Sequence, residues 1–277
     1  MSAATNKIFK LLTYLFLVAA VLFAVFPVYW MLVAGFRHPE TVYNDYSLIP
    51  TRPSIQSFLS INNYINYAAQ YKNSLIVAFS VTIATMLLST FTAYAIARFE
   101  FRGRKLLTVT MLFAYMFPPL LTLIPLYVIF VHMGISGTLL SLVLAELSVT
   151  MPLAIWMLWG FFKSMPFQLE EAAMIDGCSR LGSFMRIILP LARPGLLSVA
   201  LFSFLIAWNG YTAASILITE DSNKTLPIGL AQIVANMTGN WGVAMAACAA
   251  IVAPLIIIFI CLNRYFIQGL VGSGVKG

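Results

Sequence analysis

The chain has 277 residues, of which 61% are hydrophobic and only 9% are charged. Its mean hydropathy of +0.92 is far above the range of water-soluble folds, so a soluble globular domain is excluded. A net charge of +7 would suit nucleic acid in a soluble protein, but no nucleic-acid partner is expected of so apolar a chain. Its three cysteines match neither a disulfide framework nor a metal-ligand motif, so no metal site is expected.

Six long runs with at most one charge each predict six transmembrane helices. Each run supplies roughly the 20 apolar residues that a helix needs to cross a bilayer. Helices are expected because a lone segment in lipid must satisfy its own backbone hydrogen bonds. The predicted spans cover about 11–36, 73–97, 106–131, 138–162, 195–219 and 243–263.

The positive charges predict how these spans are oriented. If the N-terminus is cytoplasmic, twelve of the 16 Lys and Arg fall on the cytoplasmic side, in agreement with the positive-inside rule. The C-terminus and the longest cytoplasmic loop, residues 163–194, then lie on that side as well. The prediction is a multi-pass membrane protein with both termini in the cytoplasm.

Six prolines fall inside the predicted spans, and two interpretations of them stay open. Proline removes a helical hydrogen-bond donor and tends to kink a helix, so bent helices lining a cavity are one interpretation. Proline is also simply common in membrane helices. The six residues are Pro27, Pro118, Pro119, Pro125, Pro152 and Pro254.

The 163–194 loop concentrates acidic residues in the stretch LEEAAMIDG, residues 169–177. Ser164 is a candidate N-cap for a helix here, and acids are favoured in a first helical turn. Gly177 is placed to end that helix in a left-handed conformation, and Ser179 to cap a second short helix. The sequence therefore predicts two short helices with a sharp bend between them.

The first of these helices has alanines and acidic edges, which suits the groove of another protein. The alternative is an amphipathic helix lying on the membrane surface, and such helices carry Lys and Arg on their polar face. Residues 166–177 contain neither, and acids beside anionic lipid would be repelled. The composition therefore favours docking to a protein partner.

The loop contains a motif that resembles the EAA loop of ABC importer permeases. The motif reads Glu171-Ala172-Ala173, then Gly177 after three residues, then Ile187 and Leu189-Pro190. The fuller string is similar to the carbohydrate-uptake branch, the kind typified by the smaller permease of the maltose transporter. Similar stretches extend over nearly the whole chain, among them PPLLTLIPLY, WNGY and KTLPIGL.

Two positions depart from the pattern of that family. Cys178 stands where the family usually has alanine, and both side chains are small. Gly210 stands where an acidic residue often follows Trp-Asn. The second departure weakens any transfer of substrate detail from the family.

The resemblance implies a fold and a coupling site. The fold would be an all-α integral membrane protein of the type I ABC importer permease kind, one permease domain over 1–277 with six transmembrane helices. The EAA helix would sit in a groove of a cytoplasmic ABC ATPase dimer. The ATPase-coupling residues would be Glu170, Glu171, Ala172, Ala173, Asp176, Gly177, Leu189 and Pro190.

The resemblance also implies partners and a location. These are a second homologous permease, an extracytoplasmic solute-binding protein and the lipid bilayer of a bacterial or archaeal cytoplasmic (inner) membrane. A phosphate loop needs GxxxxGK followed by Ser or Thr, and the sequence has no such string. The chain is therefore not expected to be an enzyme or to bind a cofactor, and ATP and Mg would bind to the partner ATPase.

The predicted function is that of a permease subunit in an ATP-driven, binding-protein-dependent importer for a sugar, either an oligosaccharide or a glycoside. One alternative is the same type of importer for another polar solute, such as a glycerol phosphate or a polyol. A stand-alone channel or membrane enzyme is a further alternative. A catalytic constellation is hard to build from spans that contain one Glu and no His or Asp.

Candidate residues for the solute path come from polar and aromatic side chains inside the spans. Glu146 is the one charge within a span, so it should face the bundle or a wet cavity, either to bind solute hydroxyls or to tie two helices together. Aromatic faces and amides suit sugars, although an aromatic belt at the interface is the alternative interpretation. The candidates are Glu146 with Thr150 on the same face, Trp208 and Tyr211 on a shared face, Asn209 and Tyr115.

Overall fold

The computed structural model describes residues 3–236 and 241–274, with side chains described for 9–236 and 241–261. In this part of the chain the regular structure is helical apart from one isolated bridge, which pairs Arg37 with Pro53. The chain divides into two compact units. The first is Met1–Tyr67 with Leu230–Pro254, and the second is Ala68–Gly229 with Leu255–Gly277.

The first unit contains α1 (Ala3–Gly35). In this unit the short helices that follow α1 pack against the start of the last helix of the chain. Its elements are α2 (Gln56–Leu59), η1 (Ser60–Asn63), most of α12 (Leu226–Ala235) and the first part of α13 (Trp241–Gly274). A Cβ on Gly35 would lie 3.1 Å from Cα of Ala246, so glycine permits this close helix contact. The apolar stretch of α1 is otherwise unburied by the chain, as expected of a helix facing lipid.

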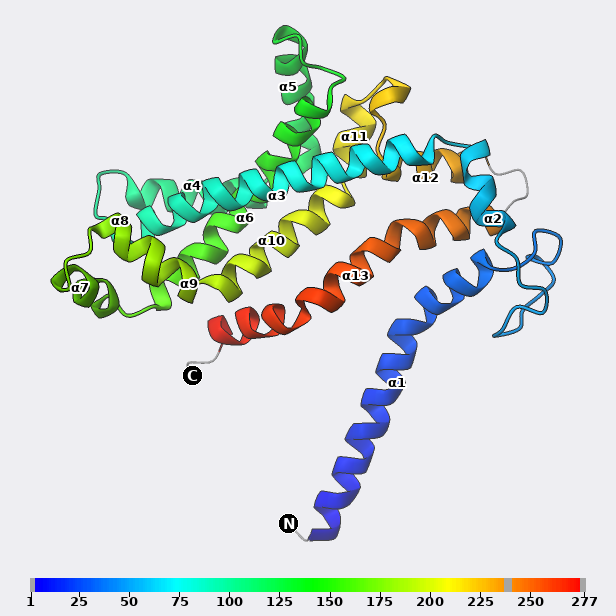
Figure 1. The fold of residues 1–277 in the computed structure, drawn as a ribbon, viewed down its shortest axis with the longest axis horizontal. Coiled ribbons are helices and arrows are strands. Elements are labelled where there is room, and N and C mark those ends of the chain that lie inside the picture. The colour runs from blue at the N-terminus through cyan, green and yellow to red at the C-terminus, as the bar shows by residue number, and fades with distance from the viewer. Residues whose placement is uncertain (1–2, 237–240, 275–277) are drawn as a thin grey trace. The chain divides into compact units, whose positions relative to one another are not determined.

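The second unit is built around α3 (Tyr67–Arg98), α6 (Leu139–Ser164) and α10 (Arg193–Trp208). Helix α6 packs against both α10 and α4, and Figure 1 shows α3, α6 and α10 running along one another. The remaining elements are α4 (Arg104–Met116), α5 (Pro119–His132), α7 (Gln168–Ile175), α8 (Arg180–Ser183), the π-helical turn η2 (Phe184–Ile188), α9 (Leu189–Leu191), α11 (Tyr211–Leu217) and η3 (Asp221–Asn223).

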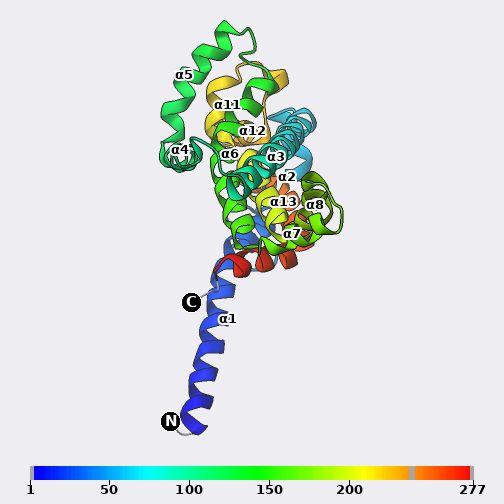
Figure 2. The same cartoon turned by 90° about the vertical axis from the view of Figure 1, so that its left-hand side faces the viewer.

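Four helices in the described chain are long and apolar enough to cross a membrane, and the number is six if each of two bent pairs counts as one span. The predicted span at 106–131 is one of these pairs. The helix direction bends by 101° between α4 and α5, which Figure 2 shows as an elbow. Pro118 and Pro119 fall at the break, because proline lacks a donor and restricts the residue before it. The predicted span at 106–131 therefore consists of two helices with a bend at the two prolines, which agrees with the kink that proline tends to cause.

The predicted span at 195–219 is also discontinuous. Helix α10 ends at Trp208, and α11 begins at Tyr211 after a break at Asn209 and Gly210. Asparagine and glycine both favour leaving a helix, so the sequence contains the reason for the break. The second bent pair consists of Arg180–Leu191 and Arg193–Trp208, with a bend of 73° between them.

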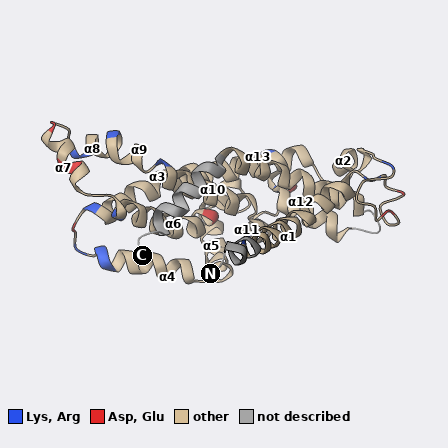
Figure 3. Cartoon of the chain, turned by 90° about the horizontal axis from the view of Figure 1, so that it is seen from below, with Lys and Arg blue, Asp and Glu red and all other residues tan. Residues whose placement is uncertain are grey.

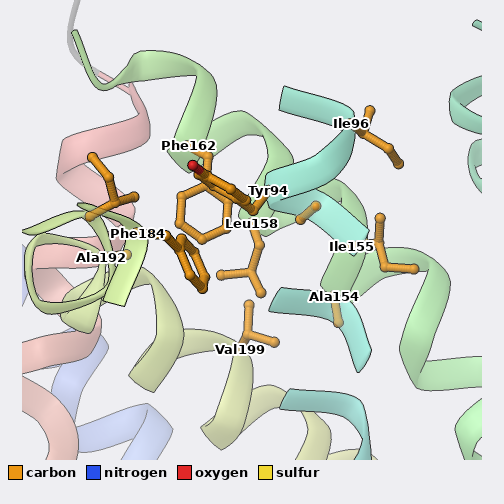
Figure 4. Close-up of a cluster of buried hydrophobic side chains, with 11 residues drawn as sticks. Tyr94, Ile96, Ala154, Ile155, Leu158, Phe162, Phe184, Ala192 and Val199 are labelled. Carbon is orange, nitrogen blue, oxygen red and sulfur yellow. The ribbon is translucent and has the colours of Figure 1, made fainter. Parts of the chain in front are cut away.

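Most charged residues of the second unit gather at one end, whereas Lys72, Glu220, Asp221 and Lys224 lie near the opposite end of α3. Figure 3 shows the gathered charges around α7 and α8 and at the turn from α3 into α4, while the middle of the helices is nearly free of charge. A buried apolar cluster lies directly under this end and holds α3, α6, η2 and α10 together (Figure 4). The 163–194 loop is therefore anchored to the long helices by a packed core.

Candidate functional site

Helix α7 ends as the sequence predicts. Gly177 has a φ of 86°, a conformation that side chains with a Cβ rarely adopt. The backbone N–H of Cys178 donates to the carbonyl of Ala173 at 2.9 Å, and that of Gly177 to Met174 at 3.1 Å. These two bonds form a Schellman motif, which closes α7 and turns the chain sharply.

The two serine caps expected in this loop have different outcomes. The Ser179 hydroxyl accepts from the backbone N–H of Gly182 at 3.1 Å, so the cap of the second helix is confirmed. The Ser164 cap is wrong, because Ser164 is the last residue of α6 and its hydroxyl donates to Phe161. Helix α7 instead begins at Gln168 without a side-chain cap.

Glu170 points into the protein and makes an ion pair there. Its side chain is 1% exposed, with Oε1 lying 2.6 Å from Nε of Arg98 on α3. That contact lacks the alignment of a hydrogen bond, but the Tyr94 hydroxyl donates to Oε2 at 2.7 Å. The Arg98 guanidinium also donates to the carbonyl of Met165 at 3.1 Å. Glu170 therefore ties α7 to α3.

The exposed side of α7 contains only part of the predicted coupling set. Glu171, Ala172, Asp176 and Gly177 are exposed, whereas Leu189 and Pro190 are partly buried. Glu170 and Ala173 are buried within the described chain, so their side chains face the permease itself. Helix periodicity places them on the inner face, three residues apart.

Aromatic packing underneath connects this loop to the long helices. The Tyr94 ring lies 4.2 Å from that of Phe184 and 5.9 Å from that of Phe162, measured between centroids. The three rings come from α3, η2 and α6, and Figure 4 shows them packed together beside Leu158, with their planes tilted or edge-on to one another. Motion of α7 passes directly to its neighbours, because its inner face is held to α3 by Glu170 and packs against η2.

Glu146 is buried in α6 and faces the break between α10 and α11. It is 5% exposed, and no hydrogen bond reaches its carboxylate from the part of the chain that the structure describes. A Cβ added to Gly210 would collide with that carboxylate. Thr150, predicted on the same face, hydrogen bonds to Thr85 of α3 at 2.9 Å and donates to the Glu146 carbonyl at 3.0 Å. Thr150 is thus a tie between helices.

The aromatic pair predicted on one helix face is separated by the break. Trp208 is 1% exposed and stacks on Phe204, with 5.7 Å between ring centroids. Tyr211 begins the next helix and is 47% exposed, so the shared face of Trp208 and Tyr211 is wrong. Asn209 is exposed, and its amide donates to the carbonyl of Leu205 at 2.8 Å. The break at Asn209 and Gly210 turns the chain between Trp208 and Tyr211.

Tyr115 lines a cavity of about 880 Å³ in the elbow of α4 and α5. Helix α6 contributes Ser148 to the same cavity, and Thr110 and Thr122 add hydroxyl groups. The sequence analysis missed these three residues. The adjacent prolines at 118 and 119 indicate where this cavity forms, because the bend that they cause leaves space between α4 and α5.

Comparison with known protein families identifies the family of this chain. The family described as "Binding-protein-dependent transport system inner membrane component" matches residues 85–272, which include α7, the Glu146 region and the elbow of α4 and α5. The chain belongs to this family. It is a multi-pass inner-membrane protein and the permease component of an ABC transporter, so ATP hydrolysis belongs to another subunit.

Curated relatives of this permease cover nearly all of its length. It is 33% identical to the inner membrane ABC transporter permease protein YcjP of Escherichia coli, over 99% of this chain and 100% of that protein. It is also 33% identical to the trehalose/maltose transport system permease protein MalG of Thermococcus litoralis (95% and 96%) and to the diacetylchitobiose uptake system permease protein DasC of Streptomyces coelicolor (94% and 95%).

The fold agrees with a solved transporter. One chain of a bacterial ABC transporter involved in the import of the acidic polysaccharide alginate matches with a TM-score of 0.80, over 96% of this chain and 99% of that one. The identity is 19%, so this likeness concerns the fold. The expected fold, an all-helical ABC importer permease, is confirmed.

Proposed function

We propose that this permease, a subunit of a binding-protein-dependent ABC importer for sugars or oligosaccharides, transmits the motion of its ATPase through α7. The observation that carries the proposal is the division of α7 into two faces. Glu171, Ala172 and Asp176 are exposed on one face, while Glu170 on the other is fixed to Arg98. One face is free for a partner and the other passes its motion to α3.

The small side chain of Ala172 lets a partner surface approach the helix closely. Glu171 and Asp176 have no ion-pair partner in the described chain, so their charge is available to basic groups of the ATPase. Leu189 and Pro190 follow the second short helix and support the loop from its edge. Together these residues form the coupling surface that we assign to the cytoplasmic ATPase dimer, which binds ATP and Mg.

The remaining partners follow from the type of importer. We assign a second homologous permease and an extracytoplasmic solute-binding protein, with residues 1–277 acting as one permease domain in the bilayer. Support comes from a solved bacterial alginate ABC transporter, described in complex with a pentasaccharide-bound periplasmic protein. Both termini lie in the cytoplasm in this assignment, because twelve of the 16 Lys and Arg then fall on the cytoplasmic side, in agreement with the positive-inside rule.

The solute path runs past Glu146 and the elbow cavity in this proposal. Glu146 offers a buried carboxylate that receives no hydrogen bond from the described residues, and Tyr115 offers an aromatic face on a cavity large enough for a small ligand. Asn209 and Tyr211 are exposed beside the helix break. Thr150 and the buried Trp208 support this path from behind.

The chemistry of the cavity favours a sugar, either an oligosaccharide or a glycoside, over a glycerol phosphate. A phosphate would be matched by Arg or Lys, and the residues lining the cavity include neither. A neutral polyol fits the same groups as a sugar and is the second candidate. A stand-alone channel is the third, and the test below separates it from an importer.

The first experiment is gentle extraction of the tagged permease followed by mass spectrometry of what co-purifies. We expect a phosphate-loop ATPase and a second permease. The matched variants are Glu171→Lys on the exposed face of α7 and Glu100→Lys, which is exposed in the α3–α4 turn. Reversing a charge at an interface weakens binding. We therefore expect Glu171→Lys, but not Glu100→Lys, to lower sugar-dependent ATP hydrolysis on the order of tenfold.

Three results would contradict the proposal. One is a permease that purifies alone and conducts sugar in liposomes, which would indicate a channel. Another is Glu171→Lys with full sugar-dependent ATP hydrolysis at normal protein levels. The third is an equal loss in both variants, because that would show a general effect of added positive charge at this end of the molecule.

A further inference from the structure

A second, smaller cavity lies within the first unit, apart from the residues assigned to the solute path. Its volume is about 230 Å³. It lies where the end of α1, the 36–55 loop and the first turn of α13 meet. We call it the loop pocket, and it is lined by Trp30, Ala34, Arg37, Val42, Tyr43, Tyr46, Trp241 and Met245.

Aromatic rings form much of the wall of the loop pocket and remain open to solvent. Tyr43 is 40% exposed, Tyr46 is 77% exposed and Trp241 is 51% exposed. Rings that belong to an ordinary core would be covered by other side chains. Exposed aromatic faces around a hollow are typical of pockets that hold a ring-shaped or apolar-faced ligand.

A buried arginine gives this pocket a polar floor. Arg37 is 2% exposed, and its guanidinium carbon lies 4.5 Å from the centroid of the Trp30 ring. Nη2 donates to the carbonyl of Ser47 at 2.6 Å. Nε has no hydrogen bond in the described chain and faces Oδ2 of Asp45 at 3.8 Å. The guanidinium is therefore held in place with N–H donors left over for a ligand.

The loop that carries the tyrosines is organised around Asp45. Its carboxylate accepts from the backbone N–H of Ser47 and of Thr51, each at 3.0 Å, and from the Thr51 hydroxyl at 2.9 Å. The first turn of α13 joins the same arrangement, because the backbone N–H of Trp241 donates to the Tyr43 hydroxyl at 3.3 Å. A pocket organised before binding loses less entropy when a ligand enters.

The charge balance selects the kind of ligand. Asp45 sits beside Arg37, so the floor of the loop pocket presents N–H donors with little net charge. A phosphate or carboxylate would meet the Asp45 charge along with the arginine. A neutral molecule with hydroxyl acceptors and a flat C–H face matches both the donors and the rings.

We propose that the loop pocket binds one ring of a neutral saccharide on the outer side of the membrane. The size agrees, since the cavity is smaller than the roughly 300–1,000 Å³ of pockets for drug-sized ligands. The pocket would hold a terminal sugar unit near the permease before or after its release by the binding protein. The inference rests on the proposed function for its cargo and its orientation.

The test uses the whole importer in phosphatidylcholine nanodiscs, without binding protein or nucleotide. The probes are trehalose, maltose and diacetylchitobiose, observed by saturation-transfer NMR, and each probe is also tested for transport in proteoliposomes. The transported probe should receive saturation through its ring C–H protons. Tyr46→Ala and Trp241→Ala should each reduce that signal about fivefold or more, because aromatic anchors dominate small interfaces.

Matched controls are Tyr64→Ala in the same unit and Trp156→Ala in the second unit, both partly exposed aromatics outside the pocket. They should leave the signal unchanged. A probe that is transported but gives no signal overturns the loop pocket while the importer function stands. Signal that survives in both pocket variants also overturns it.

Two further outcomes are decisive. If phosphatidylglycerol nanodiscs abolish the signal and glycerol 3-phosphate competes for the pocket, the site belongs to a lipid headgroup and the saccharide proposal is overturned. If no probe is transported by a complex that hydrolyses ATP normally, sugar import fails, and the saccharide site fails with it.

Discussion

Two carboxylates are buried in the second unit, Glu170 on α7 and Glu146 on α6, and they are held differently. Glu170 lies against Arg98 and accepts from the Tyr94 hydroxyl. Glu146 faces the break at Gly210, and no hydrogen bond to its carboxylate comes from the described chain. Removing a carboxylate from water costs free energy. A partner offsets that cost at Glu170, whereas no described side chain offsets it at Glu146.

The difference distinguishes a structural joint from a site that is left available. The pair at Glu170 and the aromatic core around Tyr94 connect the coupling helix firmly to α3 and α6. Glu146 retains its hydrogen-bonding capacity beside a place where a helix is interrupted. Interrupted membrane helices with polar groups near the break are typical of transport paths.

The largest expected effect comes from breaking the paired carboxylate. Arg98→Ala would leave Glu170 buried without its partner, which destabilises proteins by about 3–5 kcal/mol. Both side chains are almost fully buried, at 6% and 1% exposed, so solvent screening does not reduce this cost much. We expect a clear fall in the denaturation midpoint of the purified importer and loss of the ATPase subunit during purification.

The control for this prediction keeps the shape and removes both charges. In the double variant Arg98→Met with Glu170→Gln, the amide side chain introduced on α7 can still accept a hydrogen bond from the Tyr94 hydroxyl. This variant should recover most of the denaturation midpoint. Arg102→Ala changes an exposed arginine at the same end and should have little effect. If Arg98→Ala is as mild as Arg102→Ala, the ion pair is not a structural joint.

This comparison also shows what the sequence could predict. The bend at Gly177 and the cap at Ser179 depend on neighbours within a few residues, and both are present. The inward direction of Glu170 depends on Tyr94, which is 76 positions away in the chain. An acid in a first helical turn is favourable whichever way it points, so local physics could not choose the face.

The solute path was harder to predict for a related reason. Trp208 and Tyr211 share a face only if the helix continues between them, and it ends at Trp208. The Asn-Gly pair that ends it was visible in the sequence, but the run of apolar residues on both sides suggested one span. The packing of Trp208 on Phe204 and the elbow cavity arise from long-range contacts that hydropathy does not contain.

An intermediate effect is expected at the unpaired carboxylate. Gly210 has a φ of −65°, so its backbone does not require glycine, but a Cβ there would collide with the Glu146 carboxylate. Gly210→Ala should therefore displace the flexible end of the Glu146 side chain, at a cost of about 0.5–1.5 kcal/mol for leaving its rotamer, and should lower sugar transport. Combining it with Glu146→Ala removes the collision, so the denaturation midpoint should recover.

Measuring sugar transport in this double-mutant cycle distinguishes a role of Glu146 in solute contact from a role in packing. If Glu146 contacts solute, the pair regains stability but not transport. If the pair regains both, Glu146 is only a packing group, and our assignment of it to the solute path is wrong. Gly160→Ala on α6 is the control, because a Cβ there would meet nothing within 4 Å.

The smallest effect concerns a third carboxylate, Asp45, which lies outside the spans. The hydrogen bond from the Ser47 hydroxyl, followed by those from the backbone of Thr51 and Ser47, holds the pKa of Asp45 well below its ordinary value. Because the folded pKa is lowered, the stabilisation from this group is fully present above the ordinary pKa of about 3.9. It is lost as the pH falls from there through the folded pKa.

The loop pocket should therefore stay ordered from pH 7 to about pH 4 and loosen only in stronger acid. Fluorotryptophan at Trp30 and Trp241 reports this through ¹⁹F NMR, since both rings line the pocket. Asp45→Asn removes the titrating group, so its signals should be shifted already at pH 7 and should change little on acidification. Asp221→Asn, at an exposed acid, should behave like the wild type. Equal acid responses in Asp45→Asn and wild type would show that this carboxylate does not organise the loop, and that some other group does.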